Sequence, residues 1–128
     1  MDFKFGKEYK LCSKKYIDTL FADGKKLRQF PFSMVVISAE HDSPPFKVLI
    51  VVPKKNIRKA HDRNYLKRCM RESIRKNKHI LESALNEMNK KINFAFIYTQ
   101  REMSDFHQVE KSTEKALKKL ILELHENE

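Results

Sequence analysis

Glycine is almost absent from this sequence, with two residues in a chain of 128. Neither of the glycine-rich loops that bind nucleotide phosphates, G-x-x-x-x-G-K and G-x-G-x-x-G, occurs in it. We therefore expect no nucleotide cofactor.

Cysteine and long apolar runs are also scarce. Cys12 and Cys69 lie far apart and form no Cys-x-x-Cys pair, so no disulfide framework or structural zinc site is indicated. No apolar run approaches the roughly 18 to 20 residues of a membrane span, and the N-terminus lacks the apolar run of a signal peptide. We expect a soluble, cytoplasmic protein with one domain over residues 1–128 and no membrane partner.

The titratable residues show no pattern typical of catalysis. The five histidines form no His-x-x-x-His or Glu-paired motif, so surface or capping roles are favoured for them, with an RNA contact left open for His61 beside the basic segment. Helix capping and ion pairing explain Asp62 and Glu72 more simply than proton transfer or metal binding. We expect no catalytic residue and no metal ligand in this chain.

Positive charge is abundant, and it is concentrated in one segment. Residues 53–79 carry eleven Lys and Arg against two acidic residues, so this segment holds +9 of the chain's net +10. Such an excess attracts polyanions and is weakened by salt, which favours nucleic acid as the partner. A solvated, lysine-rich helix face is the simpler alternative.

Hydrophobic patterns predict elements in the order αββααβα. Apolar residues at helical spacing predict helices over 13–23, 63–77, 79–89 and about 105–124, and β-branched or aromatic runs predict strands over 32–39, 46–52 and 92–98. The candidate N-caps are Ser13, Asp62 and either Ser104 or Asp105, and Gly24 is the expected end of the first helix. Turn residues between the first two strands predict a hairpin.

The helix predicted over 63–77 separates charged from apolar residues. At about 100° per residue, one arc is polar and mostly cationic, with Arg63, Asn64, Lys67, Arg68, Arg71 and Arg75. The other arc can pack on a core through Leu66, Cys69, Met70, Ser73 and Ile74. The arginines favour phosphate recognition, because a planar guanidinium binds phosphate oxygens with defined geometry.

Aromatic residues offer a second kind of RNA contact. Stacking on an unpaired base contributes about 1 to 3 kcal/mol where it occurs. The candidates are Tyr16, Phe21, Phe32 and Tyr65. Core packing is the alternative for each of them.

Several residue types recur at fixed offsets in the basic segment. Lys54-Lys55 is followed by a short connection, by Arg63-Asn64 and by Lys67-Arg68-x-x-Arg71-Glu72. This pattern resembles the signature of the bacterial ribonuclease P protein component, and residues 10–24 and 92–98 extend the resemblance over nearly the whole chain. Tyr65 replaces the third residue of that family's Arg-Asn-Arg, and Arg58 stands where the family often has glycine.

The resemblance implies a fold and an activity. The implied fold is an α/β (α+β) sandwich of two layers, in which a small, mostly antiparallel sheet packs with helices as in some ribosomal proteins. It includes a left-handed crossover through the basic helix, where sequence pattern alone predicts a right-handed one. The implied activity is that of an endoribonuclease subunit that promotes removal of the 5′ leader of precursor tRNA, with catalysis and most of the Mg²⁺ belonging to the RNA subunit.

The resemblance also implies sites on this chain. Contacts to ribonuclease P RNA are expected from Lys54, Lys55, Arg58, Lys59, His61, Arg63, Asn64, Lys67, Arg68 and Arg71. The leader of precursor tRNA is expected in a cleft between the basic helix and the sheet, lined by Tyr16, Phe21 and Phe32. The alternatives are a ribosome-associated RNA-binding module and a DNA-binding regulator, the latter disfavoured because strands precede the basic helix.

Overall fold

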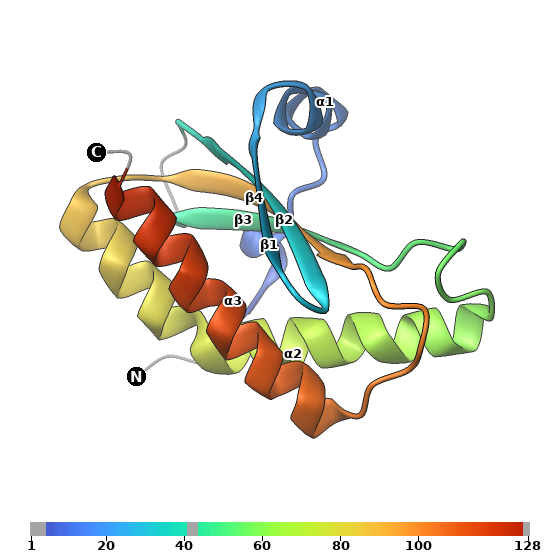
Figure 1. Cartoon of the computed structure of the whole chain (residues 1–128). Helices are drawn as coiled ribbons and strands as arrows, with labels where there is room; N and C mark the ends of the chain where they lie inside the picture. The colour runs from blue at the N-terminus through green and yellow to red at the C-terminus, as the bar shows by residue number, and fades with distance from the viewer. Residues whose placement is uncertain (1–4, 41–43, 127–128) are drawn as a thin grey trace.

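The computed structural model describes residues 5–40 and 44–126, with elements in the order αβββαβα after a short 3-10 turn (Figure 1). The turn η1 spans Lys7–Tyr9. The helices are α1 (Lys14–Asp23), α2 (Ala60–Met88) and α3 (Phe106–Glu126), and the strands are β1 (Lys25–Gln29), β2 (Phe32–Ser38), β3 (Phe46–Val51) and β4 (Ile92–Tyr98). None of the described helices is both long enough and apolar enough to span a membrane.

The four strands form one sheet in the order β1-β2-β4-β3. Strand β4 pairs antiparallel with β2 and parallel with β3. Parallel neighbours cannot be joined by a tight turn, and α2 supplies the crossover between β3 and β4. The predicted class, a small and mostly antiparallel sheet packed with helices, is confirmed.

The predicted hairpin between β2 and β3 is wrong, because both strands pair with β4, which lies between them. Strand β2 forms its hairpin with β1, which the sequence did not predict. Only Leu27 is buried in β1, so this edge strand lacks an apolar pattern. The apolar strand over Ile92–Tyr98 was predicted with the bounds that β4 has.

The two helices predicted over 63–77 and 79–89 form one helix, α2, whose 29 residues extend about 43 Å. Neither glycine nor proline interrupts it. Because α2 begins at Ala60, Asp62 lies in its first turn and is not the predicted N-cap; Lys59 holds that position without a side-chain bond. Asn89 ends the helix in the left-handed conformation, with a φ of 53°.

The predicted ends of α1 and α3 are confirmed. Gly24 is the residue after α1, and the position requires glycine. A Cβ there would lie 2.4 Å from the Leu20 carbonyl oxygen and 2.6 Å from Val35 Cγ1. Asp105 caps α3: its Oδ1 accepts a bond of 2.9 Å from the Gln108 amide, and Gln108 Oε1 accepts one of 3.1 Å from the Asp105 amide. Ser13 holds the N-cap position of α1 but makes no side-chain cap bond.

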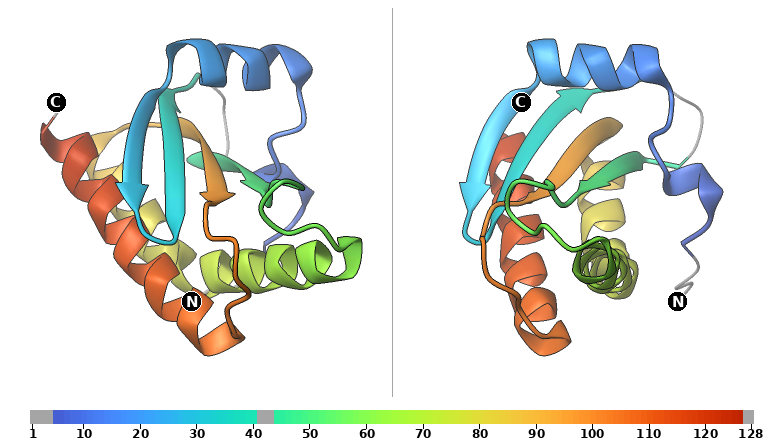
Figure 2. Two further views of the ribbon diagram at one scale, coloured as in Figure 1. Left: turned by 45° about the vertical axis from the view of Figure 1, so that its right-hand side comes forward. Right: turned by 90° about the vertical axis from the view of Figure 1, so that its right-hand side faces the viewer.

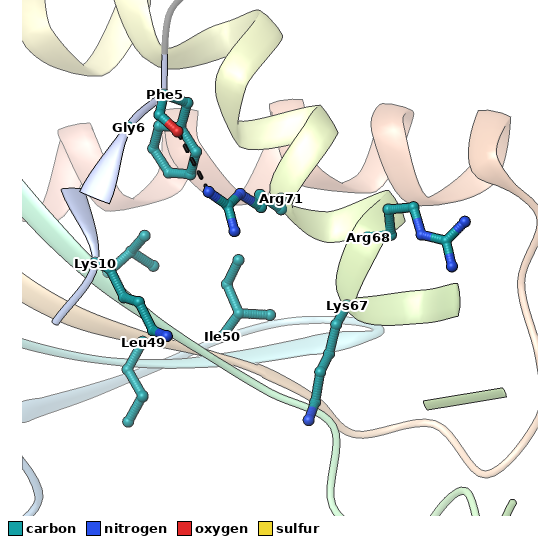
Figure 3. Close-up of a pocket in the computed structure, with 9 residues that line it drawn as sticks. Phe5, Gly6, Lys10, Leu49, Ile50, Lys67, Arg68 and Arg71 are labelled. Atoms are coloured by element: carbon teal, nitrogen blue, oxygen red, sulfur yellow. Dashed lines mark hydrogen bonds between the residues drawn. The ribbon is translucent and has the colours of Figure 1, made fainter. Parts of the chain in front are cut away.

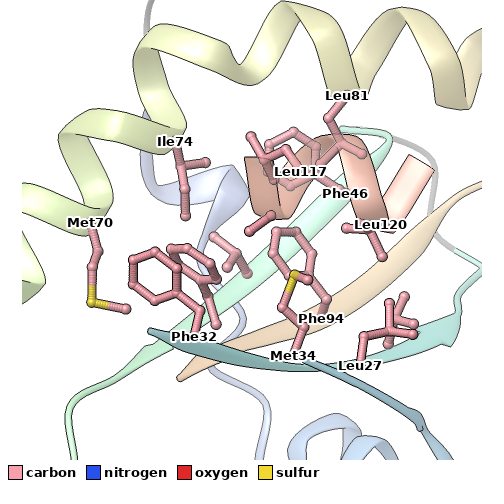
Figure 4. Close-up of a cluster of buried hydrophobic side chains, with 14 of the residues drawn as sticks. Leu27, Phe32, Met34, Phe46, Met70, Ile74, Leu81, Phe94, Leu117 and Leu120 are labelled. Carbon is pink, nitrogen blue, oxygen red and sulfur yellow. The ribbon is translucent and has the colours of Figure 1, made fainter. Parts of the chain in front are cut away.

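Helices lie on both faces of the sheet (Figures 1 and 2). Helices α2 and α3 cover one face over the main core, whose side chains include Met34, Ile74, Leu81, Phe94 and Leu117 (Figure 4). On the other face, α1 packs over a smaller cluster of Leu11, Leu20, Val35 and Ala95. Successive residues of β2 and β4 therefore pack against different helices on the two faces of the sheet. Helix α1 adds a partial third layer to the two layers that were predicted.

Candidate nucleic-acid interface

The basic segment forms the connection from β3 to α2 and the N-terminal half of α2. The connection is held by Asn56, whose Nδ2 donates a bond of 3.2 Å to the Tyr98 carbonyl oxygen, and by the buried side chain of Ile57. Its four cations, Lys54, Lys55, Arg58 and Lys59, are all exposed, and so is His61 at the start of the helix. The fold therefore anchors this connection through neutral residues and leaves its charges at the surface.

Arg63 has a different place from the one predicted. It is half-buried, and its Nη1 donates to the carbonyl oxygens of Ile57 at 3.0 Å and Arg58 at 2.7 Å. These bonds fold the connection back onto the first turns of α2. Arg63 thus positions the exposed cations, and its own guanidinium is partly occupied within the chain.

The predicted arcs of the basic helix are confirmed by burial. Leu66, Cys69, Met70, Ser73 and Ile74 are buried, whereas Asn64, Lys67, Arg68 and Arg71 are exposed. Arg75 lies on the exposed side but pairs with Glu72, to which its Nε and Nη2 donate bonds of 2.9 and 2.5 Å. These hydrogen bonds hold the pKa of the Glu72 carboxyl below its usual range.

A pocket of about 380 Å³ lies between the N-terminal segment, β3 and the exposed side of α2 (Figure 3). Apolar side chains of β3 and Phe5 share its lining with Lys10, Lys67, Arg68 and Arg71. Arg71 reaches toward Phe5: its Nη2 lies 3.4 Å from the Phe5 carbonyl oxygen, and its Cζ lies 5.8 Å from the centre of the ring. The pocket combines cations with an apolar floor, which suits a phosphodiester strand with unpaired bases.

A second pocket of about 340 Å³ joins the connection before α2 to the segment after β4. Arg101 and Met103, both exposed, line it together with Lys55, Arg58 and Lys59. Neither Arg101 nor Lys10 was predicted to belong to the interface, because each is remote in sequence from the basic segment. The only signal was their charge.

The three aromatic residues predicted to line one cleft do not lie together. Tyr16 and Phe21 are 53% and 44% exposed on α1, on the face of the sheet opposite to α2. Phe32 is 1% exposed and packs in the main core, with its ring centre 4.2 Å from that of Phe96. A cleft between the basic helix and the sheet shared by Phe21 and Phe32 is therefore not formed, because β2 directs Phe32 toward the helices.

No metal centre is apparent in the part of the chain that the structure describes. It contains no group of three or more His, Cys, Asp and Glu side chains placed to hold a metal ion. The acidic residues nearest in sequence to the interface, Asp62 and Glu72, are surrounded in the sequence by cations, and Glu72 is bonded to Arg75. The interface is suited to binding a polyanion.

Comparison with known proteins identifies the family to which this chain belongs. The family model described as Ribonuclease P matches residues 5–121. The chain belongs to the family of bacterial ribonuclease P protein components. It is thus a component of ribonuclease P, a ribonucleoprotein endoribonuclease of tRNA processing.

Curated relatives and solved structures agree. The ribonuclease P protein component of Porphyromonas gingivalis is 34% identical over 116 residues, which cover 90% of this chain and 85% of that protein. The component of Chlorobaculum tepidum is 35% identical over 97 residues, covering 69% and 62%. The solved ribonuclease P protein of Thermotoga maritima superposes with a TM-score of 0.68 at 27% identity, covering 86% of this chain and 96% of that one. The Staphylococcus aureus protein, at 23% identity, shows the same fold, with a TM-score of 0.70 and coverage of 88% and 94%.

Proposed function

We propose that this ribonuclease P protein binds the catalytic RNA through the exposed cations of residues 54–71 and binds the 5′ leader of precursor tRNA through α1. The observation that carries the proposal is the exposure of nearly all the predicted basic residues on the connection before α2 and on one side of its N-terminal half. When Lys and Arg side chains bind RNA phosphates, they release counterions from the RNA. The affinity for RNA should therefore fall steeply as the salt concentration rises.

Lys67, Arg68 and Arg71 form the centre of this RNA-binding surface. They extend from the helix toward the pocket beside β3, and the cations of the preceding connection continue the surface. Arg63 supports it by holding two carbonyl oxygens of the connection. Asn64 and His61 are exposed neighbours that can bond RNA without adding fixed charge.

Leader binding is proposed for α1, where Tyr16 and Phe21 present exposed rings on which unpaired bases can stack. Phe32 has no part in it, because its ring is buried in the core. Replacing Phe21 by leucine should weaken binding of leader-bearing precursor more than binding of mature tRNA. Equal weakening of both RNAs would contradict the role of α1.

The reaction's Mg²⁺ is proposed to belong to the RNA. The described residues do not fit a magnesium site, since this ion takes oxygen ligands from carboxylates and water and no acidic cluster is present among them. The protein contributes by positioning substrate and reducing repulsion between phosphates. The cytoplasm is the expected location of this assembly.

Reconstitution with a bacterial ribonuclease P RNA tests the proposal. At low Mg²⁺, the protein should stimulate cleavage of precursor tRNA, because its cations offset the phosphate repulsion that Mg²⁺ otherwise screens. The double variant Lys67→Gln/Arg68→Gln should lose most of the stimulation. Lys115→Gln, which removes an exposed cation from α3, is the matched control and should retain it.

RNA binding without stimulation of cleavage would contradict the proposal. That result would favour an RNA-binding module that acts outside ribonuclease P.

A further inference from the structure

Two aromatic residues hold the N-terminal segment against α2. Phe5 and Tyr9 stack with their ring centres 5.0 Å apart and an angle of 25° between the rings. Arg71 and Lys78 lie on one side of α2, about two turns apart. The Arg71 Cζ lies 5.8 Å from the ring centre of Phe5, and the Lys78 Nζ lies 4.7 Å from that of Tyr9. Each ring of the stack therefore contacts one cation of the helix.

Tyr9 is the fixed part of this arrangement. Its side chain is buried, and its hydroxyl donates a bond of 3.2 Å to Glu82 Oε1. The following residue, Lys10, forms a parallel bridge with Val48 of β3. Because the segment is held to both the helix and the sheet at this point, the Phe5 ring that stacks on Tyr9 has a defined place beside α2.

Arg71 is an exposed cation of α2 that Phe5 contacts in two ways. Its Nη2 donates a bond of 3.4 Å to the Phe5 carbonyl oxygen, and its guanidinium lies over the Phe5 ring (Figure 3). Among the described residues, the Phe5 carbonyl is the only hydrogen-bond acceptor for Arg71, so its other N–H groups can bind a ligand. An arginine that is ordered before binding loses less conformational entropy when the ligand arrives.

The surroundings of Arg71 indicate the kind of ligand. Lys10 and Lys67 line the same pocket, and Figure 3 shows these two lysines and Arg71 around the side chain of Ile50. No acidic side chain is among the described residues that line this pocket. A guanidinium binds a phosphate group through two parallel N–H bonds. The ligand that fits is a phosphodiester group of RNA.

We propose that Phe5 is a positioning residue that orients the Arg71 guanidinium toward a phosphate of the catalytic RNA. The N-terminal segment is then part of the RNA-binding surface, although it is remote in sequence from the basic segment. This inference rests on the proposed function in taking Arg71 as a contact of that RNA. Loss of the Phe5 ring should weaken RNA binding about two- to fivefold, the effect of one cation–π contact at an exposed site.

A double-mutant cycle on the full-length protein tests whether Phe5 acts through Arg71. The affinity for a bacterial ribonuclease P RNA is measured for the unmodified protein, Phe5→Leu, Arg71→Gln and the double variant. Phe5→Leu should weaken binding about two- to fivefold when Arg71 is present and should have no further effect in Arg71→Gln. Equal weakening in both backgrounds, or full affinity in Phe5→Leu, would overturn the proposal.

Two further variants are the controls for this cycle. Phe5→Tyr keeps an aromatic ring and should retain the affinity of the unmodified protein. Phe106→Leu removes a ring whose centre lies 5.0 Å from the Lys76 Nζ, outside the RNA-binding surface, and should not change the affinity. Phe5 and Phe106 are both partly buried against the main core, so this control accounts for an effect of lower stability. The proposal fails if Phe106→Leu or Phe5→Tyr weakens RNA binding as much as Phe5→Leu does.

NMR of the Arg71 side chain gives a readout that a change in stability alone would not alter. The ring current of Phe5 should shift the Arg71 resonances upfield in the free protein. This shift should disappear in Phe5→Leu and persist in Phe5→Tyr. Arg71 resonances that are the same in the unmodified protein and in Phe5→Leu would show that the ring does not hold the guanidinium, which would overturn the proposal.

Failure of the proposed function would give a different result. If Arg71→Gln binds the RNA as tightly as the unmodified protein, Arg71 is not an RNA contact, and the proposed function fails at this residue together with the role of Phe5. If Arg71→Gln weakens binding and Phe5→Leu does not, the proposed function stands and the role of Phe5 alone is overturned.

Discussion

Both halves of α2 carry basic residues, but these residues lie in different environments. In the N-terminal half, Lys67 and Arg68 are exposed beside a pocket that is open to a ligand. In the C-terminal half, Lys78 is 3% exposed, with its Nζ 3.8 Å from Glu82 Oε1, 3.4 Å from the Tyr9 hydroxyl and 4.7 Å from the centre of the Tyr9 ring. Lys67 and Arg68 are thus exposed to solvent, whereas Lys78 is held by contacts within the chain.

The difference arises from what packs against each half. Helix α3 and the η1 turn bring Glu110 and Tyr9 to the C-terminal half, where Lys76 lies 3.9 Å from Glu110 and 5.0 Å from the Phe106 ring centre. The N-terminal half extends past the sheet (Figures 1 and 2). A count of basic residues therefore overestimates a binding surface, because tertiary partners remove some cations from it.

The largest effect is expected for a cation in the C-terminal half. Lys78→Met should lower the free energy of unfolding by about 1.5 to 3 kcal/mol, since it removes a buried, charged hydrogen-bond donor and leaves Glu82 without its ion pair. Urea unfolding measures this loss. The salt dependence of RNA binding should not change.

The control is Lys118→Met, which breaks an exposed pair with Glu114 on α3 and should cost less than about 1 kcal/mol. Equal losses in the two variants would show that Lys78 is no more structural than a surface lysine.

A smaller effect is expected on RNA affinity, where substitutions of Arg68 and Lys76 should give different salt dependences. Arg68→Gln should lower the slope of log affinity against log salt by about 0.7 to 0.9, the value of one phosphate contact. Lys76→Gln should change it little, because Glu110 and Phe106 already hold that cation. Titration with ribonuclease P RNA at several salt concentrations measures both slopes, and equal slopes would remove the distinction between the halves.

The smallest effect concerns the boundary between the halves, where Arg75 pairs with Glu72. The hydrogen bonds from Arg75 lower the pKa of Glu72 in the folded chain, so the pair stabilises the fold above the ordinary glutamate pKa of about 4.3. This stability is lost as pH falls from that value through the lowered pKa. Because the pair is partly exposed, it should contribute less than about 1 kcal/mol.

Unfolding measured across the acid range should therefore show a shallower pH dependence for Glu72→Gln than for the unmodified protein. Glu114→Gln, at a more exposed pair, is the control. An unchanged pH profile in Glu72→Gln would show that the ion pair is not maintained in solution.

The sequence predicted those strands and helices whose pattern depends only on residues close together in the chain. The run over residues 92–98 is apolar throughout because β4 lies at the centre of the sheet and is covered on both faces. The helical period separated Leu66, Met70 and Ile74 from the exposed cations, and burial confirms that separation. The spacing of lysine, arginine and asparagine also identified the family.

Features that depend on residues far apart in the chain could not be predicted from the sequence, for physical reasons. Strand β1 has one buried residue and exists because β2 offers it a hydrogen-bonding edge. Phe32 was expected in a cleft, but pairing of β2 with β4 directs its ring into the core. The partial burial of Arg63 depends on carbonyl oxygens that become available only when the connection before α2 folds back.

The sequence by itself determined that this protein carries a concentrated positive charge on an amphipathic helix. Only the tertiary structure decided which cations stay free, since each one's environment depends on residues far away in the chain. It also brought Phe5 and Arg71 to the same pocket, although they are far apart in sequence. Helical and strand periods are local properties, whereas pairing and burial depend on contacts that form when the whole chain packs.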